Sequence, residues 1–256
     1  MKRVLPILKG FAIPVFIIVI WQSLSMYIQN SFILPGWETI IPVLIHPAEP
    51  LFGGASLFQN SLISLQRVLY GFLLAVFIAV PLGLLCGWSK SAEDYVNPII
   101  QILRPVPPIA WMPLAIAWFK IGFGSLLFII FIGSFFPVFI STIEGMRSIR
   151  IRWLEVAQTL GATTLEKFKT VVIPGALPSI WTGLRLAFGV AWMCLVAAEM
   201  LPGTSAGLGY LIMFAYNLGQ IQVIVAGMIV IGVIGIVSDS IFRIGQTRLF
   251  GWQGKE

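Results

Sequence analysis

Six apolar stretches of about 20 residues follow one another along this chain, and they constrain its fold more than any other feature. A helix of that length and composition crosses the hydrocarbon core of a membrane. Of the 256 residues, 58% are hydrophobic and 10% are charged, whereas a soluble domain carries roughly 25% charged residues. We therefore expect an all-α membrane protein with six transmembrane helices. The expected spans are Gly10–Ile28, Leu62–Trp88, Ile99–Phe119, Ser125–Ile143, Ser179–Leu201 and Ile221–Phe242.

The first and third stretches depart from a simple apolar span. The first follows a basic N-terminus, as a signal peptide does, but it extends to about Ile28 without a small-residue cleavage site, which favours an uncleaved span. Prolines interrupt the beginning of the third stretch, at Pro105, Pro107, Pro108 and Pro113. Proline inside a span is tolerated where neighbouring helices cover the freed carbonyls, so we expect the third helix to be buried in protein.

Lysine and arginine occur in alternate connections between the expected spans, and such residues mark the cytoplasmic side. The basic segments carry Lys2, Arg3, Lys9, Lys90, Arg147, Arg150, Arg152, Lys167, Lys169, Arg243, Arg248 and Lys255. The connections 29–61 and 202–220 carry none, and 120–124 carries only Lys120. This distribution predicts that both termini lie in the cytoplasm. It also accounts for the net charge of +6 without a nucleic-acid partner.

The connection 150–174 is long, polar and ordered by its own sequence signals. Apolar residues recur at helical spacing over 151–160, which predicts a short amphipathic helix that Gly161 ends. Thr163 and Glu166 have the spacing of a capping box, so a second helix is expected over 163–172. Pro174 and Pro178 are expected to break that helix before the fifth span. Taken alone, this elbow is equally compatible with a loop that rests on lipid headgroups.

The spacing within the elbow resembles the cytoplasmic coupling loop of ABC importer permeases. Residues in register with that loop are Glu155, Ala157, Gly161 with Ala162 beside it, Val171 and Pro174, while Val156 and Ile173 depart from the usual Ala and Leu. Segments 61–87, 103–122 and 184–212 are similar to permeases of the nitrate, sulfonate, taurine and bicarbonate group, except that Lys120 replaces a small residue. The resemblance covers nearly the whole chain from residue 61 onward.

The resemblance implies a type I importer fold and a homodimer. It implies that two separate ATPase subunits bind the elbow and hold the ATP and magnesium, while a substrate-binding protein docks outside. This chain itself is then not an enzyme and binds no cofactor, and it contains no GxxxxGK[ST] phosphate loop. We expect a first transmembrane helix and an outside surface segment over 1–60, followed by a permease core over 61–256.

Charged residues within spans are costly and are functional candidates by default. The candidates for the translocation pathway are Arg67, Arg104, Arg185, Glu199, Ser205 and Gly207. Snorkelling to water or helix pairing is the alternative for Arg67, and a structural or gating role is the alternative for Arg104. For Arg185 the alternative is a tie to backbone carbonyls of a neighbouring helix. Glu144 is expected to be a salt-bridge or interface partner of nearby arginines. The Gly-rich segment 202–210 lacks the Lys of a phosphate loop and is expected to be a flexible turn or gate at the outer mouth.

The leading function is ATP-driven import of a small anionic solute of the sulfonate, taurine, nitrate or bicarbonate type. Import of a vitamin precursor or an aromatic solute by the same machinery remains open. An ion-coupled secondary transporter would need inverted repeats, broken helices and buried acidic groups, of which only Glu199 is a candidate. An intramembrane enzyme or metal site is disfavoured, because His46 is the only histidine and the two cysteines, Cys86 and Cys194, lie within apolar runs.

Overall fold

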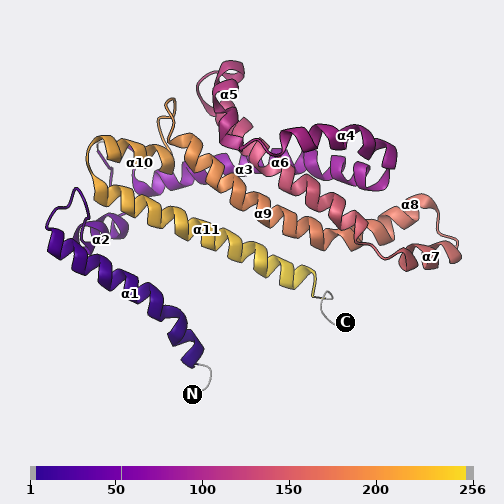
Figure 1. The fold of residues 1–256 in the computed structure, drawn as a ribbon, viewed down its shortest axis with the longest axis horizontal. Coiled ribbons are helices and arrows are strands. Elements are labelled where there is room, and N and C mark those ends of the chain that lie inside the picture. The colour runs from indigo at the N-terminus through magenta and orange to yellow at the C-terminus, as the bar shows by residue number, and fades with distance from the viewer. Residues whose placement is uncertain (1–3, 53, 252–256) are drawn as a thin grey trace.

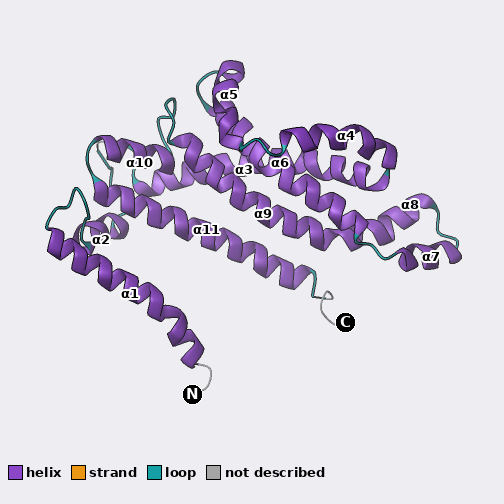
Figure 2. Ribbon diagram, viewed as in Figure 1, coloured by secondary structure: helices purple, strands orange, loops and turns teal. Residues whose placement is uncertain are grey.

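The computed structural model describes residues 4–52 and 54–251, with side chains from residue 13 onward. Within these residues every regular element is a helix (Figure 2). Lys2, Arg3 and Lys255 lie outside the described residues, as does the side chain of Lys9. The helices are α1 (Val4–Ile28), α2 (Trp37–Ile45), α3 (Leu57–Trp88), α4 (Lys90–Leu103), η1 (Pro108–Trp111), α5 (Met112–Phe119), α6 (Phe123–Arg147), α7 (Ile151–Thr159), α8 (Thr164–Lys167), η2 (Phe168–Val172), α9 (Ile173–Glu199), α10 (Leu208–Asn217) and α11 (Ile221–Leu249).

Four helices are long and apolar enough to cross a membrane: α3, α6, the continuous helix Thr164–Glu199, and α11. They run side by side as the body of the molecule, while α1 diverges from α11 at one edge (Figure 1). The pair α4 and η1–α5 adds a fifth span if the two pieces count as one. The membrane-protein class is thus confirmed, whereas the count of six spans stays a prediction.

A stripe of small residues explains why α3 packs closely on α6. Every fourth residue of α3 is Gly or Ala over five positions, and the first four are buried. The stripe consists of Gly71, Ala75, Ala79, Gly83 and Gly87. A Cβ atom on Gly83 would lie 2.7 Å from Cβ of Thr142, which shows how near α6 approaches. Small residues at this spacing let backbones approach, and the resulting van der Waals contact holds helices together in lipid.

The other face of α6 packs on α9 in the same manner. Gly183 of α9 lies against Ser141 of α6, and Gly145 of α6 lies against Ser179 of α9. Buried aromatic rings tie α9 to its other neighbours. Phe188 makes an edge contact with Phe72 of α3 at 5.3 Å between ring centroids. The helices α3, α6 and α9 therefore form the packed core on which the polar sites are built.

The third expected span is broken rather than continuous. The helix α4 begins at Lys90, earlier than expected, and an 88° bend separates it from η1–α5. The bend follows from Pro105, Pro107 and Pro108, because proline lacks the amide hydrogen and restricts the residue before it. The burial expected from neighbouring helices is incomplete within this single chain, since Gln101 and Arg104 are exposed.

The elbow contains the two expected helices, at the end of the bundle where α7 projects away from it (Figure 1). Gly161 has a φ of +81°, and two backbone hydrogen bonds end α7, from Ala162 N to the carbonyl of Ala157 and from Gly161 N to that of Gln158. This is a Schellman motif, and it explains the spacing of Ala157, Gly161 and Ala162. Thr163 and Glu166 form the expected capping box at the start of α8.

The prolines that follow the elbow do not break the helix, contrary to expectation. The π-helical turn η2 leads from α8 directly into α9, so that Thr164–Glu199 is one helix of 36 residues. Pro174 occupies the first turn of α9, where the wider π turn accommodates its missing donor, and Pro178 lies buried inside the helix.

Candidate functional site

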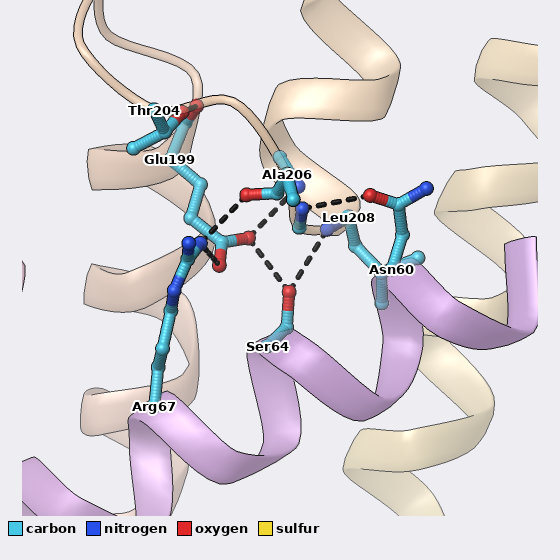
Figure 3. Close-up of polar contacts among 9 residues, drawn as sticks. Asn60, Ser64, Arg67, Glu199, Thr204, Ala206 and Leu208 are labelled. Carbon is cyan, nitrogen blue, oxygen red and sulfur yellow. Dashed lines mark hydrogen bonds and ion pairs between the residues drawn. The ribbon is translucent and has the colours of Figure 1, made fainter. Parts of the chain in front are cut away.

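One face of α3 presents three polar residues to the end of α9. Asn60, Ser64 and Arg67 are spaced four and three residues apart, so their side chains share this face. Glu199 is the last residue of α9, and its side chain is fully buried. Its carboxylate accepts hydrogen bonds from Ser64 Oγ at 2.7 Å and from Arg67 Nη1 at 2.8 Å (Figure 3).

The same carboxylate caps the N-terminus of α10. Gly209 N donates to Glu199 Oε2 at 3.1 Å, and Leu208 N donates to Ser64 Oγ at 2.8 Å. These amides are among the donors that a helix leaves unpaired at its first turn, where an anion is favoured. The phosphate-loop character of the Gly-rich segment therefore has a physical basis: the segment does bind an anion, and that anion is Glu199.

The turn between α9 and α10 is held at several further points. Arg67 Nη1 donates to the carbonyl of Ala206 at 2.6 Å, and Gly207 N donates to Asn60 Oδ1 at 2.8 Å. Gly207 has a φ of +117°, and a Cβ atom there would lie 2.3 Å from Glu199 Oε1. We call Asn60, Ser64, Arg67, Glu199 and residues 204–209 the outer cluster.

The outer cluster corrects two expectations from the sequence. The segment 202–210 is not a free turn, because its backbone is bonded to α3 and α9 over residues 206–209. Arg67 and Glu199 pair with each other, so the helix-pairing alternative holds for Arg67. Of the pathway candidates in this region, only Ser205 is exposed.

Arg185 is engaged by a residue that the sequence analysis missed. Its Nε and Nη2 atoms donate to the two carboxylate oxygens of Asp239 on α11, at 2.5 and 2.9 Å. A bidentate pair of this kind fixes both the distance and the orientation of the two helices. Arg185 does tie α9 to a neighbouring helix, but through a carboxylate rather than backbone carbonyls. The signal was present, since Asp239 is a single acidic residue inside an apolar stretch.

The charges at the other end of α6 pair differently from the prediction. Arg147 pairs with Glu93 of α4. Among the described residues of this single chain, Glu144 has no ion pair within 4 Å, so the expected salt bridge does not form within the chain. Both Glu144 and Arg104 line a cavity of about 410 Å³ between α6 and the bend after α4.

The elbow leaves apolar side chains without cover in the isolated chain. None of the residues of α7 is buried, and Ile151 and Leu160 are 71% and 81% exposed. Leu165 of α8 is 60% exposed. Of the coupling-loop positions, Glu155, Gly161 and Pro174 are exposed, and the others, Ala157, Ala162 and Val171, are half-buried.

The described residues contain no group of three or more His, Cys, Asp or Glu side chains that could hold a metal ion. His46 Nδ1 lies 3.8 Å from Glu49 Oε1 in an exposed connection. Both cysteines are buried and unbonded.

Comparison with known proteins agrees with this architecture. Residues 79–251 match the family described as the binding-protein-dependent transport system inner membrane component. The chain is 49% identical to a putative ABC transporter permease protein of Methanocaldococcus jannaschii, over 94% of this chain and 91% of that protein. It is 37% identical to a putative aliphatic sulfonates transport permease protein of Bacillus subtilis, over 96% and 88%.

A solved structure extends the comparison to the fold. The crystal structure of an amino acid ABC transporter with histidines aligns with 81% of this chain and 94% of its own, with a TM-score of 0.65 at 16% identity. The expected family and the all-helical importer fold are therefore confirmed. This chain belongs to the inner membrane permease components of binding-protein-dependent ABC transport systems.

Proposed function

We propose that two copies of this chain form the translocation pathway of an ATP-driven importer for a small anionic solute. A substrate-binding protein delivers the solute outside, and two ATPase subunits, which hold ATP and magnesium, bind the elbow inside. The solute class is that of the sulfonates, taurine, nitrate and bicarbonate. Both termini lie in the cytoplasm, in keeping with the basic residues at that side.

The observation that carries this proposal is the surface of the elbow. Ile151, Leu160 and Leu165 are exposed on a segment whose shape is fixed by a Schellman motif and a capping box. A rigid segment with uncovered apolar side chains is typical of a docking surface. Of the positions that match coupling loops, Ala157, Gly161 and Ala162 form its turn.

In an alternating-access mechanism, the elbow transmits movement from the ATPase subunits to the membrane helices. Closure of the ATPase dimer moves the two elbows together, and the helix that continues from each elbow carries this movement into the membrane. An ion-coupled mechanism is poorly supported by Glu199, because Arg67, Ser64 and the first turn of α10 already occupy its carboxylate.

The substitution Gly161→Asp tests the coupling assignment. An aspartate at a φ of +81° strains the turn and places a charge on the docking surface, so we expect uptake to be lost while the dimer stays folded. Gly54→Asp, in the connection before α3, adds the same charge at an exposed glycine that lacks a positive φ, and it is expected to keep full uptake. The measurements are solute uptake in cells, size-exclusion chromatography, and copurification with the ATPase from detergent. Normal uptake by Gly161→Asp with ATPase still bound contradicts the assignment.

A further inference from the structure

The helix α4 presents two chemically opposite surfaces. One side carries polar residues that recur every three or four positions: Glu93, Asn97, Gln101 and, at the C-cap, Arg104. The opposite side carries large apolar residues that are 59–79% exposed in the isolated chain: Tyr95, Ile99 and Ile102. A third side, with Val96 and Leu103, packs against the hydrophobic core, and the buried Ile100 lies between this side and the polar one.

The polar side of α4 lines two adjoining cavities. A cavity of about 210 Å³ contains Asn97 and Gln101, and the cavity of about 410 Å³ adjoins it. The two share Arg104 on one wall and Ile140 and Glu144 on the other. We call this feature the inner furrow. Its combined size falls within the range of about 300–1,000 Å³ that is usual for ligand pockets.

The inner furrow runs from the cytoplasmic rim to the middle of the bundle. Arg147 and Glu93 form the rim and neutralise each other. From Glu144 the lining continues along α6 to Gly133, a rise of about 16 Å. This is roughly half of the hydrocarbon thickness of about 30 Å.

Two charges remain inside the furrow. Arg104 and Glu144 are both exposed, and neither has an ion pair within 4 Å among the residues that the structure describes. Charges and amides on the surface of a span do not face hydrocarbon, because burial there without partners is too costly. The apolar side of α4 suits lipid, so the polar side requires water, a solute or both.

We propose that the inner furrow is the cytoplasmic half of the transport pathway and that it receives a small solute carrying both an anionic and a cationic group, such as an aminoalkane sulfonate. The Arg104 guanidinium pairs with the oxyanion, whose planar donor geometry it matches. Glu144 pairs with the ammonium group, and the amides of Asn97 and Gln101 supply hydrogen bonds between them. A purely anionic solute would instead be repelled by Glu144. This inference rests on the proposed function and narrows its solute class.

Thiol labelling tests whether the furrow is wet, independently of cargo and ATP. In a chain with Cys86→Ala and Cys194→Ala, single cysteines are introduced as Asn97→Cys and Gln101→Cys, and as Tyr95→Cys and Ile102→Cys on the opposite side. The assembled importer is then exposed in vesicles to a charged, membrane-impermeant thiol reagent. We expect the first pair to react about tenfold faster, because the thiolate forms only in contact with water. Equal rates, or faster reaction of the second pair, overturn the proposal.

Protection from labelling tests the solute class with two matched sulfonates. We expect 2-aminoethanesulfonate to slow the labelling of Gln101→Cys about threefold more than ethanesulfonate does, through its extra ion pair with Glu144. Glu144→Gln should remove this difference, Arg104→Gln should abolish protection by both, and Arg104→Lys should retain part of it. Glu49→Gln, outside the furrow, should change nothing. Equal protection by the two sulfonates, or none, overturns the solute assignment.

Failure of these tests is distinguishable from failure of the proposed function. Loss of ATPase copurification contradicts the importer assignment but leaves the labelling pattern of α4 unaffected. If cysteines at both 97 and 101 fail to react in an importer that still binds its ATPase, only the proposal for the inner furrow is contradicted.

Discussion

The outer cluster and the elbow are two polar regions of this largely apolar chain, and they use their polar groups in opposite ways. In the outer cluster every oxygen of the Glu199 carboxylate meets a donor of the same chain, and its side chain is fully buried. In the elbow the hydrogen bonds only shape the turn, while Ile151, Leu160 and Leu165 remain exposed. A polar segment in a membrane protein therefore indicates a partner only where its own contacts leave surface uncovered.

The strongest test of this contrast is Glu199→Ala. The change removes the acceptor of Gly209 N and one of the two acceptors of the Arg67 guanidinium, and the Arg67 side chain is only 18% exposed. We expect the free energy of unfolding to fall by about 3–5 kcal/mol, as when one partner of a buried ion pair is removed. Thermal unfolding in detergent measures the loss. A variant with unchanged stability would show that the cluster does not hold α3, α9 and α10 together.

Two glycines with positive φ values sharpen the comparison. Gly207→Ala introduces a Cβ atom 2.3 Å from a Glu199 oxygen, so strain and a displaced carboxylate together are expected to cost about 2–4 kcal/mol. Gly161→Ala meets nothing within 4 Å, and only the backbone strain of about 1–2 kcal/mol is expected. Thermal unfolding of the two variants measures both losses of stability. Equal losses would mean that the outer cluster accommodates a Cβ atom as readily as the elbow does.

The smallest effect on the fold is expected from Thr163→Ala. This change removes the capping box that begins α8, at a local cost of about 1 kcal/mol. Hydrogen exchange of the amides in α8 should become faster. If the elbow docks a partner as proposed, uptake should fall severalfold while the unfolding temperature changes little. If the unfolding temperature instead falls as far as in Glu199→Ala, the elbow is part of the core.

Much of this architecture follows from the sequence alone. The Schellman turn at Gly161 and the capping box at Thr163 are local patterns, so they are readable without tertiary context. The stripe from Gly71 to Gly87 is equally local, although its partner on α6 is not. Small residues every four positions reveal a packing face but not which helix fills it.

The pairing of charges could not be predicted in the same way. Arg67 and Glu199 lie 132 residues apart in the chain, and only the packing of α3 against α9 brings them together. Arg185 and Asp239 likewise meet because α9 and α11 are neighbours. Pro174 does not end the helix as its sequence context predicts, since a π turn before it removes the conflict that proline normally causes.

The uninterrupted helix from Thr164 to Glu199 joins the two regions mechanically. Its 36 residues extend for about 54 Å, well beyond the hydrocarbon thickness of about 30 Å. It acts as a lever with the elbow at one end and the Glu199 carboxylate at the other. A tilt of about 5° displaces one end relative to the other by about 5 Å, which exceeds the length of any hydrogen bond in the outer cluster. In the proposed orientation, a movement of the elbow in the cytoplasm is thus large enough to break or remake hydrogen bonds at the far end of this helix.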